Sequence, residues 1–133
     1  MESFNLEIIT PDREFFSGPC ESLTVTTPQG EMGIMAGALP LVANLTDGGI
    51  KILQKNKWMR AYVGSGFIKT GKGGAVMLVQ SAEWPYEIKE KDVQDNIDRL
   101  ESRLKKEQSL KEYRTAKAQL ARQLARLRVK KEI

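Results

Sequence analysis

Short apolar segments separated by turn residues fill the first two-thirds of the chain. They recur at the spacing typical of an all-β sandwich or barrel, and several alternate apolar and polar residues with a period of two. We expect strands over residues 4–10, 20–27, 41–45, 50–54, 58–63 and 75–80. Residues 75–79 are apolar throughout, which predicts burial on both faces of the sheet. Because no helical period lies among these segments, the pattern argues against alternating βαβ units.

The pattern changes at Pro85. All 11 Gly and all 5 Pro lie at or before this residue, and the last 48 residues contain neither. Gly and Pro both destabilise helix interiors, so their disappearance predicts a change from sheet to continuous helix. We therefore expect a β domain over residues 1–85 and a helical domain over residues 86–133.

Two one-sided helices are predicted after this boundary. The first carries its apolar stripe at Val93, Ile97, Leu100 and Leu104. Ser109 and Glu112 then have the spacing of a capping box, which predicts the start of the second helix. The apolar side of the second helix is expected at Leu110, Tyr113, Ala116, Leu120, Leu124 and Leu127. Two such helices joined by a short turn should fold into an antiparallel hairpin, and the stripes are too short to favour a coiled-coil dimer.

The composition removes several classes of chemical site. The chain has no His, the side chain most used for proton transfer near neutral pH and the commonest metal ligand. One cysteine, Cys20, excludes an internal disulfide and a cysteine-based zinc site, and its position in a predicted strand favours a buried structural thiol. No run approaches the ~18 apolar residues of a membrane span, and the N-terminus resembles neither a signal nor a transit peptide. We expect no catalytic residue, no metal and no cofactor.

One glycine-rich stretch resembles a phosphate-binding loop. Residues 66–73 satisfy the pattern GxxxxGK, but Gly73 then stands where that loop needs Ser or Thr. Such a loop must also lead into a helix whose N-terminus faces the phosphates, and here a strand is predicted to follow. We interpret the stretch as a hairpin turn.

The positive charge belongs to the end of the chain. Residues 1–85 carry 7 Lys and Arg against 8 Asp and Glu, whereas residues 86–133 carry 14 against 9. The predicted second helix is strongly basic, with Glu112 as its one acidic residue up to position 131. This face is either simply solvated or directed at an acidic partner. Nucleic acid is disfavoured because only Tyr113 could stack on a base, and lipid because the apolar stripe lacks Trp and Phe.

Taken together, these residues resemble the epsilon subunit of F-type ATP synthases. The densest similarity is GEMGIMAGALPL at residues 30–41, beside the family's G-E-x-G-I-x-x-G-H-x-P-L. AEWP at residues 82–85 and LARQLARLRV at residues 120–129 are also typical, as are Pro11, Phe16 and Gly18. The similarity covers nearly the whole chain in order. It implies a flattened ten-stranded β-sandwich followed by a two-helix hairpin.

The resemblance also implies a non-catalytic rotor subunit of the central stalk, which couples ion translocation to ATP synthesis. By the family's pattern, the c-ring is contacted by Gln29, Gly30 and Glu31. The gamma subunit is contacted by Ala38, Leu41 and Ala43, although Ala38 replaces the family's usual His. The implied location is peripheral, on the cytoplasmic face of a bacterial cell membrane, with membrane association only through the complex and with no role for nucleic acid.

In this family the hairpin regulates the enzyme. It lies compact against the sandwich, or extends toward the beta and alpha subunits of the catalytic head and hinders ATP hydrolysis. The resemblance assigns this inhibition to the basic second helix, with candidate residues Arg114, Arg122, Arg126 and Arg128.

Some bacterial members bind ATP in the compact hairpin through I/L-D-x-x-R-A. Here Lys89 replaces the Asp of that motif and Asp92 replaces its Arg. The remaining candidates form a vestigial nucleotide site, namely Glu83, Ile88, Arg99, Arg122 and Arg126. We therefore expect weak or absent ATP binding. The alternatives are a stand-alone nucleotide-binding switch and a basic adaptor for membrane surfaces or nucleic acid.

Overall fold

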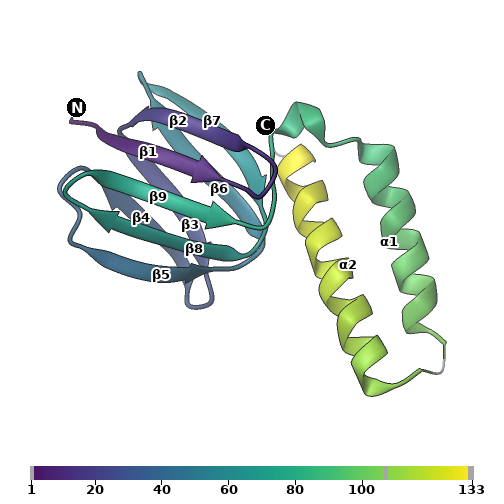
Figure 1. The fold of residues 1–133 in the computed structure, drawn as a ribbon. Coiled ribbons are helices and arrows are strands. Elements are labelled where there is room, and N and C mark those ends of the chain that lie inside the picture. Colours follow the sequence, from purple (N-terminus) through teal and green to yellow (C-terminus); the bar gives the residue numbers. More distant parts are fainter. Residues whose placement is uncertain (1, 107, 132–133) are drawn as a thin grey trace.

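Two five-stranded sheets form a sandwich, with a helical hairpin at one side of it (Figure 1). The computed structural model describes residues 2–106 and 108–131. The first sheet has the order β2 (Glu14–Cys20), β1 (Phe4–Ile9), β9 (Gly74–Val79), β8 (Gly66–Gly71) and β5 (Leu41–Leu45). The second has the order β10 (Ala82–Glu83), β7 (Lys57–Val63), β6 (Gly48–Gln54), β3 (Ser22–Thr27) and β4 (Gly30–Met35). The predicted fold class is confirmed.

A short 3-10 turn, η1 (Pro85–Glu87), leads from the sandwich into α1 (Glu90–Leu104), and α2 (Leu110–Lys131) returns beside it. The C-terminal end of α2 lies against the sandwich, while the turn between the helices points away from it (Figure 1). At that turn Ser109 Oγ accepts a hydrogen bond of 3.2 Å from Glu112 N–H, as the serine of a capping box should.

Apolar periodicity misplaced one strand boundary and missed several strands. The segment 20–27 is not one strand, because Cys20 ends β2 in the first sheet and Ser22 begins β3 in the second. The pattern continues across this crossing since Cys20 and Leu23 face the same core between the sheets. Periodicity did not find β2, β4, β8 and β10. Gly begins and interrupts β4, Gly begins and ends β8, and β10 has only two residues.

The main core lies between the two sheets. Leu6, Ile8, Leu23, Ile52 and Met77 are among its fully buried side chains. Cys20 is also fully buried, and its Sγ donates a hydrogen bond to the Ser22 carbonyl oxygen at 3.2 Å. Burial raises the pKa of this thiol, which makes the reactive thiolate form less accessible.

A second core joins the hairpin to the outer face of the second sheet, and α1 contributes Val93 and Ile97 of its predicted stripe to it. Its buried members are Tyr62, Ile88, Val93, Ile97, Ala125 and Val129. The predicted apolar side of α2 is only partly correct, because Leu110 is 63% exposed and Leu124 is 43% exposed. α2 packs against α1 and also against β6 and β7, so its buried face turns toward Ala125 and Val129 near the sandwich.

The glycine-rich stretch at residues 66–73 is a hairpin, as predicted. β8 ends at Gly71 and β9 begins at Gly74, with residue pairs from Gly66 and Val79 through to Gly71 and Gly74. No helix follows this turn, so the arrangement that a phosphate-binding loop requires is not formed.

Candidate functional site

Gln29, Gly30 and Glu31 lie at the exposed tip of the β3–β4 hairpin. Thr27 Oγ1 donates to the Gly30 carbonyl oxygen at 2.7 Å and accepts from Gln29 N–H at 3.2 Å. Gly30 has a φ of +116°, a backbone conformation that disfavours any residue with a Cβ. The local hydrogen bonds and this glycine therefore hold a small, polar and well-defined tip.

Leu41 and Ala43 lie at one edge of the first sheet, and Ala38 lies in the β4–β5 loop that leads to this edge. Leu41 and Ala43 belong to β5, which pairs with β8 on one side and is the last strand of its sheet. Such an edge offers unpaired backbone groups to a partner. The most exposed apolar side chains here are their neighbours Leu39 (79%) and Val42 (67%), whereas Ala43 is half-buried against the core.

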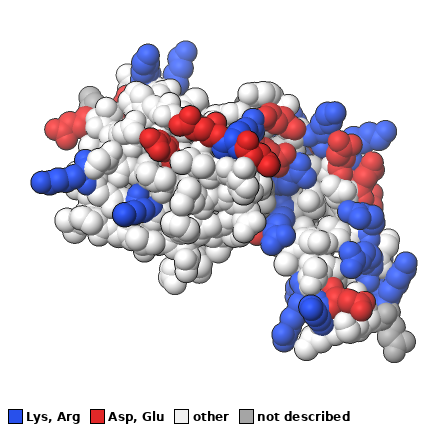
Figure 2. Space-filling view, in the orientation of Figure 1, with Lys and Arg blue, Asp and Glu red and all other residues white. Residues whose placement is uncertain are grey.

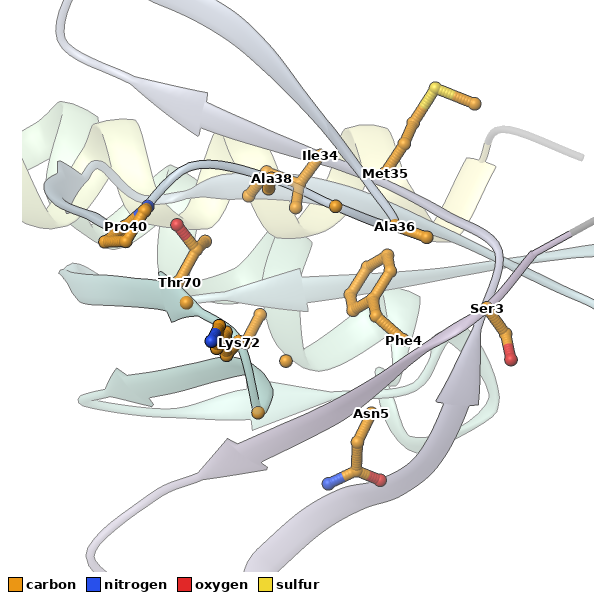
Figure 3. Close-up of a pocket in the computed structure, with 15 residues that line it drawn as sticks. Ser3, Phe4, Asn5, Ile34, Met35, Ala36, Ala38, Pro40, Thr70 and Lys72 are labelled. Atoms are coloured by element: carbon orange, nitrogen blue, oxygen red, sulfur yellow. The ribbon is translucent and has the colours of Figure 1, made fainter.

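A groove of about 520 Å³ opens beside this edge, between the start of β1, the β4–β5 loop and the β8–β9 hairpin (Figure 3). Phe4, Ala38, Pro40 and Lys72 are among the residues that line it. Thr70 Oγ1 donates to the Leu39 carbonyl oxygen at 2.7 Å and so fixes the loop above the groove.

The outer face of the first sheet carries exposed apolar side chains, and one of them, Leu78, was predicted to be buried. Phe67 and Leu78 stand opposite each other on β8 and β9, and both are exposed. Val42 extends this surface onto β5. The prediction that residues 75–79 are buried on both faces is therefore wrong for Leu78 in this chain. The sequence of residues 75–79 shows that both faces of this strand are apolar, but it does not show that the outer face is exposed in the folded chain.

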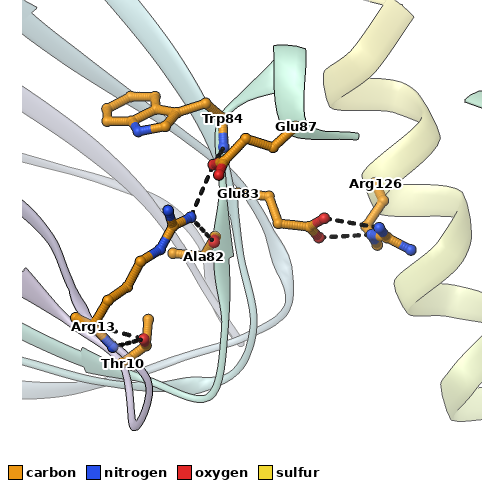
Figure 4. A network of polar contacts seen from close by, with 7 residues as sticks. All are labelled: Thr10, Arg13, Ala82, Glu83, Trp84, Glu87 and Arg126. Atoms are coloured by element: carbon orange, nitrogen blue, oxygen red, sulfur yellow. Dashed lines mark hydrogen bonds and ion pairs between the residues drawn. The ribbon is translucent and has the colours of Figure 1, made fainter. Parts of the chain in front are cut away.

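Two ion pairs connect α2 to the sandwich. Arg126 Nε and Nη2 donate to the two carboxylate oxygens of Glu83 at 2.7 and 2.8 Å (Figure 4). Arg122 Nε lies 3.3 Å from Oδ2 of Asp47, a residue of the β5–β6 turn. Arg126 Nη1 also donates to Gln123 Oε1 at 2.8 Å. Glu83 was a candidate residue in the sequence, but as part of a nucleotide site and not as a partner of Arg126, and no motif marked Asp47.

The last turn of α2 is held by further contacts. Lys130 Nζ donates to the Pro85 carbonyl oxygen at 3.0 Å, and Arg60 Nη2 donates to the Val129 carbonyl oxygen at 3.1 Å. Both cations sit at a helix C-terminus, where free carbonyl groups favour positive charge. Gly49 lies directly beneath Val129, and a Cβ added there would approach Val129 Cγ2 to 3.1 Å.

The candidate nucleotide residues are only partly assembled. Glu83 and Arg126 meet, but they neutralise each other, and Arg122 is engaged by Asp47. Arg99 donates to Asn96 Oδ1 on its own helix at 3.4 Å. Ile88 is buried in the second core and presents no surface to a ligand.

The basic face of α2 has an uneven environment. Arg114, Arg122 and Arg128 are exposed and Arg126 is half-buried, and of these Arg122 and Arg126 have carboxylate partners on the sandwich. In the view of Figure 2, Lys and Arg side chains follow the hairpin, whereas most of the visible face of the sandwich is uncharged. The charge asymmetry of the sequence is thus also an asymmetry in space.

A third polar network fixes the junction itself (Figure 4). Arg13 Nη2 donates to Glu87 Oε1 at 2.8 Å and to the Ala82 carbonyl oxygen at 3.1 Å. Trp84 N–H donates to the same Glu87 oxygen at 2.9 Å. The hydrogen bond from Arg13, followed by that from Trp84, lowers the pKa of Glu87. The Trp84 ring stacks on Phe15 at 4.3 Å, so η1 is anchored by polar and apolar contacts.

The described residues hold no group of three or more His, Cys, Asp or Glu placed to bind a metal ion. Neither α1 nor α2 is apolar enough over a sufficient length to cross a membrane.

Comparison with known proteins assigns the family. Residues 3–85 match the model described as "ATP synthase, Delta/Epsilon chain, beta-sandwich domain". The ATP synthase epsilon chain of Ruminiclostridium cellulolyticum is 40% identical over 127 residues, which cover 96% of this chain and 95% of that protein. The chain belongs to the ATP synthase epsilon chain family. The epsilon chain of Caldanaerobacter subterraneus is 35% identical over 129 residues, covering 96% of this chain and 94% of the relative.

Solved structures agree on the fold of this epsilon chain. A chain of the Euglena gracilis mitochondrial ATP synthase matches with a TM-score of 0.83 at 17% identity, covering 92% of this chain and 78% of that one. A chain from the Tetrahymena thermophila central stalk and c-ring matches with a TM-score of 0.67 at 14% identity and covers 97% of both chains. As an epsilon chain, the protein is a regulatory, non-catalytic subunit of ATP synthase.

Proposed function

We propose that this epsilon chain joins the gamma subunit to the c-ring in the central stalk, couples ion translocation to ATP synthesis, and restrains ATP hydrolysis through its hairpin. The observation that carries this proposal is family membership over both the sandwich and the hairpin. The tightly packed two-sheet body suits a joint that must transmit torque with little internal strain. Its place is peripheral, on the cytoplasmic face of the bacterial membrane, held there by the complex.

The gamma subunit docks on the β5 edge and the adjoining outer face of the first sheet. Ala38, Leu41 and Ala43 supply the edge, and the exposed Val42 supplies an apolar anchor beside them. Val42→Glu should weaken co-purification with gamma by about tenfold or more, because a charge would enter an apolar contact. Thr24→Glu, on the outer face of the second sheet, is the matched control. Undiminished binding of the Val42 variant would place gamma elsewhere.

The polar tip at Gln29, Gly30 and Glu31 contacts the loops of the c-ring. Its exposure and its fixed geometry support this role. Glu31→Lys should reduce ATP-driven ion pumping more than ATP hydrolysis, since it weakens the joint to the ring and leaves the catalytic head intact. The same charge reversal at the exposed Glu14 of β2 is the control. Equal pumping by both variants contradicts the assignment.

Arg114, Arg122, Arg126 and Arg128 restrain hydrolysis by binding acidic surfaces of the beta and alpha subunits when the hairpin extends. α2 has 22 residues, about 33 Å of helix, which is a sufficient reach. Alanine at all four positions should raise ATP hydrolysis by the assembled enzyme. The control variant has alanine at Lys91, Arg103, Lys105 and Lys106. It removes the same charge from α1 and the residues after it, and it should leave ATP hydrolysis unchanged.

ATP binding by the isolated chain is weak or absent. Lys89 and Asp92 have replaced the motif, and Arg122 and Arg126 already have carboxylate partners. Calorimetry should detect no binding at micromolar ATP. Micromolar affinity would instead favour a stand-alone nucleotide-binding switch.

A further inference from the structure

The arginines that connect the hairpin to the sandwich are two of the four proposed to inhibit hydrolysis. Arg126 meets both oxygens of Glu83, and Arg122 meets Asp47. Glu83 lies in β10 and Asp47 lies in the turn before β6, so the sandwich supplies both carboxylates. In the docked hairpin, two of the proposed inhibitory arginines are therefore already bound to carboxylates of the sandwich.

The two ion pairs differ in strength. The side chains of Arg126 and Glu83 are only 20% and 24% exposed, and their two-point contact has the favoured geometry of an arginine–carboxylate pair. Gln123 Oε1 accepts from Arg126 and also from Asn96 of α1, which orients the guanidinium group. The Arg122–Asp47 pair is longer and its arginine is more exposed, so solvent screens it more.

We infer that Glu83 and Asp47 are internal competitors of the acidic partner on the catalytic head. A guanidinium group whose N–H groups are directed at one carboxylate cannot present the same face to another. Docking on the sandwich and inhibition of hydrolysis then exclude each other through the same two side chains. This inference rests on the proposed inhibitory role of α2.

The competition also accounts for a compact hairpin without a nucleotide. The two carboxylates neutralise the guanidinium groups that a triphosphate would otherwise bind, and they belong to this chain. Val129 on Gly49 and the bond from Lys130 to Pro85 complete the docked arrangement. The compact state of this chain is therefore held by its own side chains.

Variants of the two members of one ion pair should have opposite effects on activity. Glu83→Gln loosens the hairpin and leaves Arg126 available to the acidic partner, so it strengthens inhibition. Arg126→Gln loosens the hairpin equally but removes the inhibitory cation, so it weakens inhibition. A purely structural ion pair would give effects of the same sign.

Docking is tested first on the isolated full-length chain. Spin labels on cysteines introduced at the exposed Lys72 and Ala118 report the distance between sandwich and α2, while Cys20 stays buried. Glu83→Gln and Arg126→Gln should each raise the ratio of undocked to docked chains by roughly fivefold. The double variant should add little, because both changes remove one interaction. Glu7→Gln, in the first sheet, is the control, and an unchanged distance distribution in Glu83→Gln overturns the inference.

Activity is then measured in the assembled ATP synthase. Hydrolysis should fall by roughly twofold or more in Glu83→Gln and in Asp47→Asn, and it should rise in Arg126→Gln. Asn at position 47 keeps an oxygen for the Ser65 N–H, which now donates to Asp47 Oδ1 at 2.9 Å. If Arg126→Gln relieves inhibition but Glu83→Gln does not undock the hairpin, the competition fails and the proposed function stands. If both variants undock the hairpin and hydrolysis is unchanged, the inhibitory role fails and the competition fails with it.

Discussion

Gly66 and Gly74 lie where neighbouring backbone comes too close to leave room for a side chain. A Cβ at Gly66 would overlap the carbonyl oxygen of Leu78, and one at Gly74 would overlap the backbone of Asn5. Gly74 also has a φ of +115°. Gly66, the first glycine of the loop-like pattern, and Gly74, just after it, thus permit strand packing. The sequence alone shows that glycine is present here, but not which glycine is indispensable.

Gly66→Ala should lower the free energy of unfolding by about 3 kcal/mol, because β9 must move away from the new methyl group. Gly71→Ala is the matched control, since nothing lies within 4 Å of its added Cβ. Its effect should stay within about 1 kcal/mol. Denaturant unfolding of both variants measures the difference, and equal losses would refute the packing explanation.

Tyr62 reports whether the hairpin is docked. Burial beneath α2, followed by the charge of Asp47, raises the pKa of Tyr62 to about 12. The neutral phenol is therefore the form that docking favours. Its contribution to docking is complete below the ordinary tyrosine pKa of about 10 and is lost as pH rises through the folded value.

An absorbance titration should accordingly show one tyrosine that ionises late, and Tyr62→Phe should abolish that step. Val129→Asp, which removes an apolar contact of the second core, should move the step back toward about pH 10. A late step that Val129→Asp leaves in place would show that Tyr62 does not depend on the hairpin.

At the scale of single elements, the sequence predicts a segment well when the segment has one partner. α1 buries Val93, Ile97 and Leu100 as its period requires. α2 packs against both α1 and the second sheet. A single apolar period therefore predicts burial of Leu124, which is exposed, and misses Val129, which is buried. Similarly, β5 is recognisable by its apolar residues, but its position at the sheet edge depends on pairing with β8, which local sequence does not encode.

The η1 turn depends on one carboxylate. Hydrogen bonds from Arg13 and Trp84 lower the pKa of Glu87, so the ionised form stabilises the native state. This stabilisation is present above the ordinary Glu pKa of about 4.3 and is lost as pH falls through the lower folded value. Glu87→Gln should therefore flatten the acid limb of stability against pH, measured as the denaturant midpoint. Glu14→Gln, on β2, should leave that limb unchanged, and an unaltered limb in Glu87→Gln would contradict the prediction.

At the scale of the molecule, the sequence shows where sheet gives way to helix but not how the two parts meet. The loss of Gly and Pro after Pro85 marks the change, and β10 and η1 lie there. The docked contacts use Asp47 and Gly49, which lie two residues apart, and Glu83, which lies far from both along the chain. Only the folded sheet brings them to one side.

Two separate cores should make the hairpin and the sandwich respond separately to mutation. Ile52 is fully buried between the sheets, so Ile52→Ala should lower sandwich stability by about 2–5 kcal/mol. Val129→Asp should undock α2 and leave the denaturant midpoint of the sandwich nearly unchanged, because Val129 belongs to the second core. Fluorescence of Trp58 and Trp84, both outside the helices, follows the sandwich, and helical circular dichroism follows the hairpin. The proposed function requires the hairpin to leave the sandwich while the sandwich stays folded, so a shift of both signals by Val129→Asp would contradict the proposed division of roles.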